Sequence, residues 1–463
     1  MSRPGRTPAA DPVRLLAHKV LSAVETDDAY ANLVLPHALR EAGLAARDAA
    51  FATELVYGTL RLQGRYDAMI EATIQGRGVE RLQPAMRIAL RMGAHQIHAM
   101  RVPTRAAVYE TVNLVKVVAG PAPVAMANAV LRRIADRGLA EWEEEILAPP
   151  DGLAAWESHP RWIVSAFRQA LALDGRSGEL RELLQADNTP AAVTLVARPG
   201  LADRGELVRQ IPGAEPTRFS PWGVRIPGGA PGELRGVVSG RVGVQDEGSQ
   251  LMAALAADIP LEGPDEMWLD MCAGPGGKAA LLAALARPRG AHLIANEVVD
   301  HRAGLVRRAV RPNADVVDVV VGDGRHIGED NPGYFDRVLL DAPCTGLGSL
   351  RRRPESRWRR TTADLTDLTR LQRDLIDSAV AALRPGGILT YVTCSPHAAE
   401  TVTQVVDALR RHPLPLLDGG PVLAVRGLTV EPGPDWPVPG AVQLWPHVHG
   451  TDAMFGALLR RED

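Results

Sequence analysis

The stretch Met267-Trp-Leu-Asp-Met-Cys272, followed at once by Ala-Gly-Pro-Gly-Gly-Lys278, decides the fold of the C-terminal half of the chain. A run typical of a buried strand passes into a glycine-rich turn, and the alanine- and leucine-rich residues 279–285 continue as a helix. Glycines in such a turn let a ligand approach the backbone and the helix N-terminus. The spacing matches neither a dinucleotide-binding loop nor a P-loop. The stretch therefore predicts a strand–loop–helix unit that either holds another kind of ligand or forms only a tight turn.

From residue 241 onward, further predicted strands and helices alternate in the same way. Such alternation is typical of an α/β fold in which helices cover both faces of a mostly parallel sheet. The expected strands are 267–272, 291–296, 315–321, 336–340 and 387–392, and the expected helices are 277–286, 299–310, 361–383 and 398–410.

The chain upstream of this sheet divides into regions of different texture. At 463 residues it is too long for a single core, so two or three domains are expected. Residues 11–150 have apolar side chains at helical spacing and predict an all-α domain. Residues 151–240 predict a helical linker and a small α+β region before the α/β domain of 241–463. The polar, proline-rich residues 1–10 are expected to be disordered.

The composition limits the class of protein. Apolar residues make up 46% of the chain, no apolar run is long enough to span a membrane, and the N-terminus lacks the apolar core of a signal peptide. With only three cysteines, we expect reduced thiols in a cytoplasmic protein. The net charge of −3 argues against a nonspecific coat on nucleic acid but leaves room for a local basic patch.

Acidic residues stand at the ends of four successive predicted strands: Asp270, Glu297, Asp323 and Asp341. Ligands of open α/β sheets bind at the carboxyl ends of the strands, where an acid can accept hydrogen bonds from ribose hydroxyls. Taken singly, each acid is more often a helix cap or a solvated charge. Four on successive strand ends favour a cofactor site over a set of caps.

All three cysteines follow predicted strands, and Cys344 and Cys394 follow the neighbouring fourth and fifth strands. Cysteine is most often a small buried hydrophobe, but both residues lie in polar loops of the kind that carry function. A thiolate that adds to C6 of a pyrimidine makes the otherwise unreactive C5 able to accept an electrophile. The adduct must then lose the C5 proton and release the thiol, which gives a second ionisable group a role. These positions predict covalent thiol catalysis, with Asp341 bonding the N3 or N4 edge of the base, but they do not tell which thiol attacks.

An arginine-rich segment follows Cys344: residues 351–360 contain six arginines and one tryptophan. A solvated charged loop is the usual interpretation of such a run, but its position beside the thiol loop favours contact with RNA phosphates and bases. The predicted RNA-binding residues are Arg351, Arg352, Arg353, Arg357, Trp358, Arg359 and Arg360.

Taken together, these motifs resemble the bacterial 16S rRNA cytosine-5 methyltransferase family of the Sun/Fmu type. The glycine loop is similar to the S-adenosylmethionine loop of that family, and the two cysteine motifs are similar to its paired cysteines. The resemblance covers nearly the whole chain and includes a NusB-like RNA-binding domain in the N-terminal half. The segments that carry it are 56–61, 91–96, 128–132, 244–250, 272–278, 341–346, 391–395 and 455–459.

The resemblance implies a Rossmann-like, S-adenosylmethionine-dependent methyltransferase domain, preceded by an all-α NusB-like domain and a small α+β linker domain. It implies Cys394 as the nucleophile and Cys344 as the residue that assists product release, with Asp341 and Lys278 as further catalytic residues. The cofactor-binding residues that it implies are Cys272, Ala273, Gly274, Pro275, Gly276, Gly277, Lys278, Glu297, Arg302, Asp323 and Asp341. Two positions depart from the family pattern: Gly274 stands where alanine is common, and Glu297 stands where aspartate is usual.

The resemblance further implies that the protein makes 5-methylcytosine in 16S rRNA, at position 967. We expect no metal and no membrane, and we expect a monomer, although the sequence does not determine the oligomeric state. A tRNA cytosine-5 methyltransferase is the alternative within this class, and the NusB-like domain favours rRNA. A noncatalytic RNA-binding or antitermination-like factor is the alternative from another class. Because a catalytically dead protein would need neither the two thiols nor the glycine loop, their presence favours the enzyme.

Overall fold

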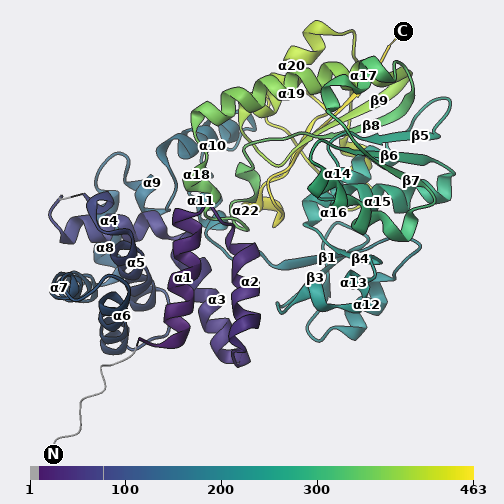
Figure 1. Cartoon of the computed structure of the whole chain (residues 1–463). Coiled ribbons are helices and arrows are strands. Elements are labelled where there is room, and N and C mark those ends of the chain that lie inside the picture. Colours follow the sequence, from purple (N-terminus) through teal and green to yellow (C-terminus); the bar gives the residue numbers. More distant parts are fainter. Residues whose placement is uncertain (1–9, 77, 463) are drawn as a thin grey trace, which may run out of the picture. The chain divides into compact units, whose positions relative to one another are not determined.

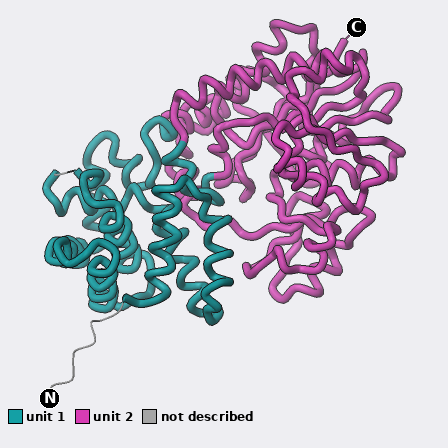
Figure 2. Tube along the Cα trace, viewed as in Figure 1, with its two compact units in different colours: residues 1–164, 350–359 teal, residues 165–349, 360–463 magenta. Residues whose placement is uncertain are grey.

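The computed structural model of the protein describes residues 10–76 and 78–462. The chain forms two compact units (Figure 2). The helical unit comprises residues 1–164 and 350–359, and the sheet unit comprises residues 165–349 and 360–463. The disorder expected for residues 1–10 concerns nine residues that lie outside the described part of the chain and Ala10, which is buried.

The helical unit is built from helices joined by short turns (Figure 1). Its core consists of apolar side chains at helical spacing, among them Leu55, Met69, Leu90, Leu114 and Leu131, which are all buried. The all-α architecture predicted for this part of the chain is confirmed. The helices are α1 (Pro12–Thr26), α2 (Ala31–Ala42), α3 (Ala46–Arg61), α4 (Gln63–Thr73), α5 (Pro84–His98), α6 (Thr104–Val118), α7 (Val124–Ala135), α8 (Leu139–Leu147) and α9 (Gly152–Trp156), and α10 (Arg161–Leu173) crosses the boundary between the units.

Residues 350–359, which are distant in sequence, complete the helical unit and contain the short helix α18 (Ser356–Arg359). The side chain of Arg357 is completely buried there. Its Nη1 donates to the backbone carbonyls of Arg61 and Ser158 at 2.9 and 3.1 Å. A guanidinium can be buried only when its donors find acceptors, and these carbonyls supply them.

Two further side chains of the same segment bond to the backbone near α1 and α2. Arg359 Nη2 donates to the carbonyls of Val24 and Ala29 at 2.8 and 2.6 Å. Glu355 Oε1 accepts a hydrogen bond from the N–H of Ala31, the first residue of α2, at 3.2 Å. The segment therefore satisfies backbone groups at helix ends that would otherwise lack partners.

The first sheet of the sheet unit is small and antiparallel. Its strands are β1 (Val193–Ala197), β2 (Glu215–Pro216), β3 (Gly223–Ile226) and β4 (Val242–Val244), in the order β2-β3-β1-β4. The helices α11 (Leu180–Asp187), α12 (Arg204–Gln210) and α13 (Arg235–Val238) belong to the same part of the chain. This is the small α+β region that the sequence predicts.

The second sheet has eight strands, and its core is parallel. The strands are β5 (Met267–Asp270), β6 (His292–Glu297), β7 (Val317–Val321), β8 (Phe335–Asp341), β9 (Leu383–Thr393), β10 (Leu416–Leu417), β11 (Val442–Gln443) and β12 (Phe455–Arg460). They follow the order β10-β12-β9-β8-β5-β6-β7, with β11 paired to β12. The five neighbouring strands β7, β6, β5, β8 and β9 are parallel to one another, and β12 runs antiparallel to β9.

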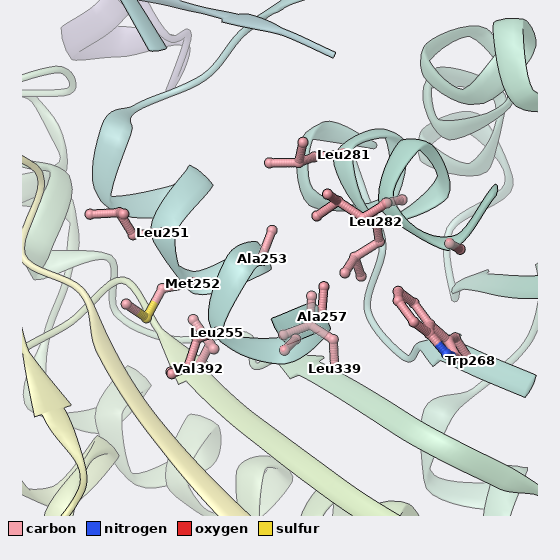
Figure 3. Packing of buried hydrophobic residues seen from close by; sticks show 14 of the residues in the cluster. Leu251, Met252, Ala253, Leu255, Ala257, Trp268, Leu281, Leu282, Leu339 and Val392 are labelled. Carbon is pink, nitrogen blue, oxygen red and sulfur yellow. The ribbon is translucent and has the colours of Figure 1, made fainter. Parts of the chain in front are cut away.

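Helices cover both faces of this sheet, as predicted for an α/β fold. Side chains of β8 alternate between two cores: Leu339 packs with one cluster, whereas Val338 and Leu340 pack with the other. Figure 3 shows part of the first cluster, where Leu339 and Val392 lie beside apolar side chains of α14, and Leu281 and Leu282 of α15 belong to the same cluster. The helices are α14 (Glu247–Asp258), α15 (Gly277–Ala286), α16 (Asp300–Val310), α17 (Ile327–Asp330), α19 (Thr362–Ala382), α20 (Val402–Arg411), α21 (Gly420–Ala424) and α22 (Pro446–His449).

The topology brings the loops after β5, β6, β7, β8 and β9 to the carboxyl edge of the sheet. On β8 and β9, Leu340 pairs with Tyr391 and Asp341 pairs with Val392, so these two strands end side by side. The loops that carry the two predicted catalytic cysteines therefore begin next to each other. No helix among the described residues is long and apolar enough to cross a membrane.

Candidate active site

The glycine-rich loop joins β5 to α15 by a tight turn. The N–H of Ala273 donates to the carbonyl of Asn296 at 2.8 Å, which ties the loop to the neighbouring strand β6. Gly276 has a φ of 106°, a conformation that L side chains rarely adopt, and a Cβ there would lie 2.7 Å from Cβ of Ala309. Helix α15 begins at the next residue, Gly277. The sequence prediction of a strand–loop–helix unit is thereby confirmed.

Glu297, at the end of β6, is buried and holds this loop in place. Its Oε2 accepts a hydrogen bond from the N–H of Gly274 at 3.1 Å, and its Oε1 accepts one from the N–H of Val299 at 3.0 Å. Arg302 donates to the carbonyl of Gly274 at 2.7 Å, and its guanidinium lies 3.5 Å from Glu297 Oε2. The structure thus brings together three of the residues predicted for a cofactor site.

Asp270, at the end of β5, is a completely buried acid, and neither of its carboxylate oxygens has a hydrogen bond of good geometry. Burial, and next the neighbouring Asp341, raise the pKa of Asp270 to about 8, although the charge of Lys278 and a weak backbone hydrogen bond from Cys272 act in the opposite direction. The ionised form of such a buried acid is unfavourable, and it marks a place where a further cationic group would be stabilised. Burial also raises the pKa of the Cys272 thiol, so this third cysteine is neutral and packs beside the loop.

Lys278 and Asp341 form an ion pair next to the glycine loop, with Nζ and Oδ2 2.8 Å apart. Burial by itself would lower the pKa of Lys278, but the carboxylate of Asp341 outweighs burial and raises it. The lysine therefore carries its positive charge at neutral pH, inside the protein and beside the thiols. Lys278 lies in the first turn of α15, and Asp341 is the last residue of β8. These positions agree with the helix and the strand expected there from the sequence.

The two thiols at the ends of β8 and β9 face each other, with their Sγ atoms 3.3 Å apart. The hydrogen bond from the Cys344 thiol lowers the pKa of Cys394, and the charge of Lys278 acts in the same direction. The same hydrogen bond, then burial and the carboxylate of Glu400, raise the pKa of Cys344. Electrostatics thus favours a thiolate at Cys394 and a protonated thiol at Cys344.

Behind the thiols, the buried carboxylate of Glu400 joins the two cysteine loops. Thr345, which follows Cys344, donates from its N–H to Glu400 Oε1 at 2.7 Å and from its hydroxyl to Oε2 at 2.5 Å. The same hydroxyl lies 3.2 Å from Oγ of Ser395, which follows Cys394. No sequence signal singles out Glu400, because a glutamate in a polar turn is usually a solvated charge.

Asp323, the remaining predicted acid, lies after β7 and is ionised. Its hydrogen bonds with Arg325 lower the pKa of Asp323 to about 2. Nearby, the buried side chain of Asn296 donates to the carbonyls of Met271 and Gly322 at 2.9 and 3.1 Å and so joins three strand ends. A cavity of about 570 Å³ is lined by Asn296, Gly322 and Asp323 together with apolar side chains and the polar residues His326, Glu329, Asp330 and Asn331. Asn296 has no counterpart in the sequence predictions.

The arginine-rich segment does not present all its side chains to solvent. Arg357 is buried and Arg359 bonds to backbone carbonyls, both within the helical unit, so their guanidinium groups have structural partners. Arg353 and Trp358 are exposed, and the Arg353 guanidinium lies 5.5 Å from the ring centre of Tyr30. Of the other predicted RNA-binding residues, Arg351, Arg352 and Arg360 are partly exposed.

Comparison with known proteins agrees with this arrangement. A sequence model of the 16S rRNA methyltransferase RsmB/F family matches residues 260–460, and a model of the NusB family matches residues 11–136. A putative methyltransferase of Mycobacterium tuberculosis is 48% identical over 99% of both chains. The ribosomal RNA small subunit methyltransferase B of Vibrio vulnificus is 31% identical, over 88% of this chain and 93% of that protein.

Solved structures share the fold. The crystal structure of PH0851 has a TM-score of 0.77 at 23% identity and covers 100% of both chains. The structure of NSun6 from Pyrococcus horikoshii with SFG has a TM-score of 0.56 at 20% identity, over 66% of this chain and 99% of that one. At these identities the likeness concerns the fold, whereas the sequence relatives match along most of the chain and the RsmB/F model spans every predicted catalytic and cofactor-binding residue. The chain therefore belongs to the 16S rRNA methyltransferase RsmB/F family.

Proposed function

We propose that the protein is an S-adenosylmethionine-dependent RNA methyltransferase that forms 5-methylcytosine through a covalent adduct between Cys394 and C6 of the base. The observation that carries the proposal is the thiol pair, 3.3 Å apart, beside the buried ion pair of Lys278 and Asp341. A cysteine thiolate is the group needed to make C5 of cytosine reactive. The hydrogen bond with Cys344 lowers the pKa of Cys394 and so favours its thiolate.

The residues along the carboxyl edge fit S-adenosylmethionine. Asp270 offers a buried acid to the cationic amino group of the methionine part, and such a partner would stabilise its ionised form. Asp323, beside a cavity of about 570 Å³, offers an ionised acceptor to the nucleoside part, and Glu297 with Arg302 shapes the loop between them. When bound, this cofactor supplies the electrophilic methyl group.

The side chains divide the chemistry between them. Cys394 attacks C6, and we assign to the Lys278–Asp341 pair the role of bonding the N3, N4 or O2 edge of the base and holding the charge that develops there. After methyl transfer, C5 must lose a proton and the C6–S bond must break. Cys344, adjacent to Cys394, is the group that we assign to this release step. Its thiol is protonated in the free enzyme, mainly through the hydrogen bond with Cys394, so it must first lose that proton once the Cys394 sulfur is bonded to C6. The Cys344 thiolate would then accept the C5 proton while the electrons of the C6–S bond return to Cys394, which leaves as a thiolate.

The substrate that we propose is 16S rRNA. Relatives from Bacillus subtilis and Vibrio vulnificus are named as small subunit rRNA methyltransferases, and the first matches this chain over 97% of its length at 29% identity. The NusB family match supports RNA binding by the helical unit. For the arginine-rich segment we propose the exposed Arg353 and Trp358 and the partly exposed Arg351, Arg352 and Arg360 as RNA contacts. Arg357 and Arg359 donate to carbonyls within the fold, and we no longer assign them to RNA.

Two cysteine variants test this function. Each would be incubated with S-adenosylmethionine and a 16S rRNA transcript, and the products separated on a denaturing gel. Cys394→Ala is expected to abolish methyl transfer and to form no adduct, whereas Cys344→Ala is expected to accumulate a covalent protein–RNA adduct. Bisulfite mapping of the modified transcript would identify the cytosine, with position 967 as the expected site. An adduct formed by Cys394→Ala would reverse the roles that we assign, and methylation at carbon or nitrogen atoms other than C5 would refute the proposal.

A further inference from the structure

We propose that Glu400 is the positioning residue of the thiol pair: it fixes the separation of Cys344 and Cys394 and thereby determines how fast the covalent adduct is resolved. The inference rests on the proposed function, because the adduct is part of that function. It concerns a residue that touches neither sulfur and acts through Thr345 and Ser395.

Glu400 is well placed to act as a rigid support because it is itself held from several directions. Gln372, on α19, donates from Nε2 to Glu400 Oε1 at 3.3 Å and to the carbonyl of Pro343 at 2.8 Å. The hydroxyl of Tyr391, on β9, donates to the backbone carbonyl of Glu400 at 2.7 Å. The side chains of all three polar residues are completely buried, so water does not compete for these hydrogen bonds.

A second tie joins the two loops through the backbone. The N–H of Gly348 donates to the carbonyl of Cys394 at 2.9 Å, and the N–H of Ala453 donates to the carbonyl of Gly348 at 2.8 Å. A Cβ at residue 348 would lie 2.0 Å from the carbonyl oxygen of Ala453, which explains why glycine stands there. This tie holds the backbone of Cys394 against the loop of Cys344, and Cys344 is held further by the bonds of the following Thr345 to Glu400.

The asymmetry between the ties has a chemical consequence. Attack on C6 requires only the thiolate of Cys394, which keeps its backbone tie when Glu400 is removed. Release requires the Cys344 side chain close to the adduct. The bonds of Thr345 to Glu400 hold the residue after Cys344, and Gln372 holds the carbonyl of the residue before it, so loss of Glu400 frees Cys344 on one side. Loss of Glu400 should therefore slow release more than attack, and the variant should resemble Cys344→Ala in accumulating adduct.

The thiol separation can be measured without RNA. Phenylarsine oxide bridges two thiols that lie close together, and Cys344→Ala defines the background rate of its reaction with the protein. Glu400→Ala and Thr345→Val are expected to slow bridging about fivefold to tenfold, the size of effect that one lost buried hydrogen bond produces. Glu400→Gln should not slow bridging, because its amide oxygen can accept from the Thr345 N–H and its amide nitrogen can donate to the Thr345 hydroxyl. Loss of the carboxylate charge also removes one cause that raises the pKa of Cys344, and this favours reaction with the arsenical.

Thr401→Val is the matched control. Thr401 is a buried threonine next to Glu400, but its hydroxyl donates to the carbonyl of His397 within the same loop, at 3.0 Å. The proposal predicts wild-type bridging for this variant. Thermal unfolding of each protein shows whether it is folded, and if Glu400→Ala fails to fold, Thr345→Val decides the question.

The second measurement is the fraction of enzyme in covalent adduct during turnover with RNA. Glu400→Ala and Thr345→Val should show a lower kcat and more adduct than the wild type, with KM for RNA changed less than about twofold. Unaltered bridging by the arsenical, or reduced activity without added adduct, would overturn the proposal. If no variant and no wild-type protein formed an adduct, the proposed function would fail, while the arsenical rates would still show whether Glu400 sets the thiol separation.

Discussion

Gly274 and Glu297 are fitted to each other, because a Cβ atom on residue 274 would lie 2.0 Å from Oε2 of Glu297. The carboxylate is not free to move away, since its oxygens accept hydrogen bonds from the N–H groups of Gly274 and Val299. By resemblance alone, these are the two positions that are unlike the usual alanine and aspartate. The glycine leaves room for an acid that is one methylene longer than aspartate, so the two departures compensate for each other.

This relationship predicts a result for a double-mutant cycle. Gly274→Ala should weaken binding of S-adenosylmethionine about tenfold or more, because the loop or the carboxylate must shift. Adding Glu297→Asp should restore most of the lost affinity, so that the two effects are not additive. Isothermal titration calorimetry gives the affinities. Gly304→Ala is the control, because a Cβ at that position of α16 meets no atom within 4 Å. Strictly additive losses would show that the two residues are independent.

Asp270 should make the stability of the cofactor-free protein depend on pH. Burial raises the pKa of Asp270 to about 8, so the folded state binds this proton more tightly than the unfolded chain does. The contribution of Asp270 to the free energy of unfolding is therefore greatest at low pH. It is lost as the pH rises from about 4, the pKa of an aspartate in the unfolded chain, toward 8. We expect Tm to fall over this range, and Asp270→Asn to remove much of the fall.

Calorimetry at several pH values tests this linkage. S-adenosylmethionine should reduce the dependence on pH in the wild type, because its ammonium group favours the ionised acid, and should do so less in Asp270→Asn. An Asn variant with the same decline as the wild type would show that another group is responsible.

Lys278 and Asp341 should shift the titration of the nucleophile in opposite directions. The cation of Lys278 lowers the pKa of Cys394, and the anion of Asp341 raises it. Lys278→Met should therefore move the acidic limb of the pH–rate profile for adduct formation to higher pH and slow the reaction at neutral pH about tenfold. Asp341→Asn should move the same limb to lower pH. Lys278→Arg, which keeps the charge, should leave the limb near its wild-type position, and shifts of equal sign for the Met and Asn variants would contradict the assignment.

Arg357 and Arg353 should respond differently to substitution, although they are four residues apart in one basic run. Arg357→Met removes a buried guanidinium from two carbonyl acceptors and should destabilise the protein by about 2–4 kcal/mol. Arg353→Ala, at an exposed position, should leave Tm nearly unchanged and should weaken RNA binding with a reduced dependence on salt. Urea unfolding and RNA titrations at several salt concentrations separate the two. A stable Arg357→Met protein with weak RNA binding would reverse these roles.

The strands of the main sheet were predictable because local sequence determines them. Apolar runs between turn residues locate β5, β6, β7 and β8 to within two residues at each end. β9 begins four residues earlier than expected, at Leu383. The Arg-Pro-Gly-Gly that follows suggests a turn, but Leu383 pairs with Phe335 across a register shift. Only the neighbouring strand reveals this pairing.

The site was predictable where its residues follow strands, and not where they meet through tertiary contacts. The acids and thiols stand at strand ends, so a parallel sheet necessarily collects them at one edge. Glu400 and Asn296 act through contacts with distant loops, and nothing in their own neighbourhood in the sequence marks them. The prediction for Arg357 was wrong for the same reason. A charged side chain in a basic run is expected to face solvent, but Arg357 is buried and donates to the distant carbonyls of Arg61 and Ser158.

The placement of residues 350–359 in the helical unit bears on how proteins of this kind can be recombined. A chimera that took residues 1–164 from a relative would combine them with residues 350–359 of this protein, although the two segments belong to the same unit. A chimera that keeps the packing of the helical unit must take residues 1–164 and residues 350–359 from the same parent protein. The helical unit is therefore encoded by two separate stretches of the gene. Substitutions in residues 1–164 and in residues 350–359 are expected to evolve together, because the two segments pack within one unit.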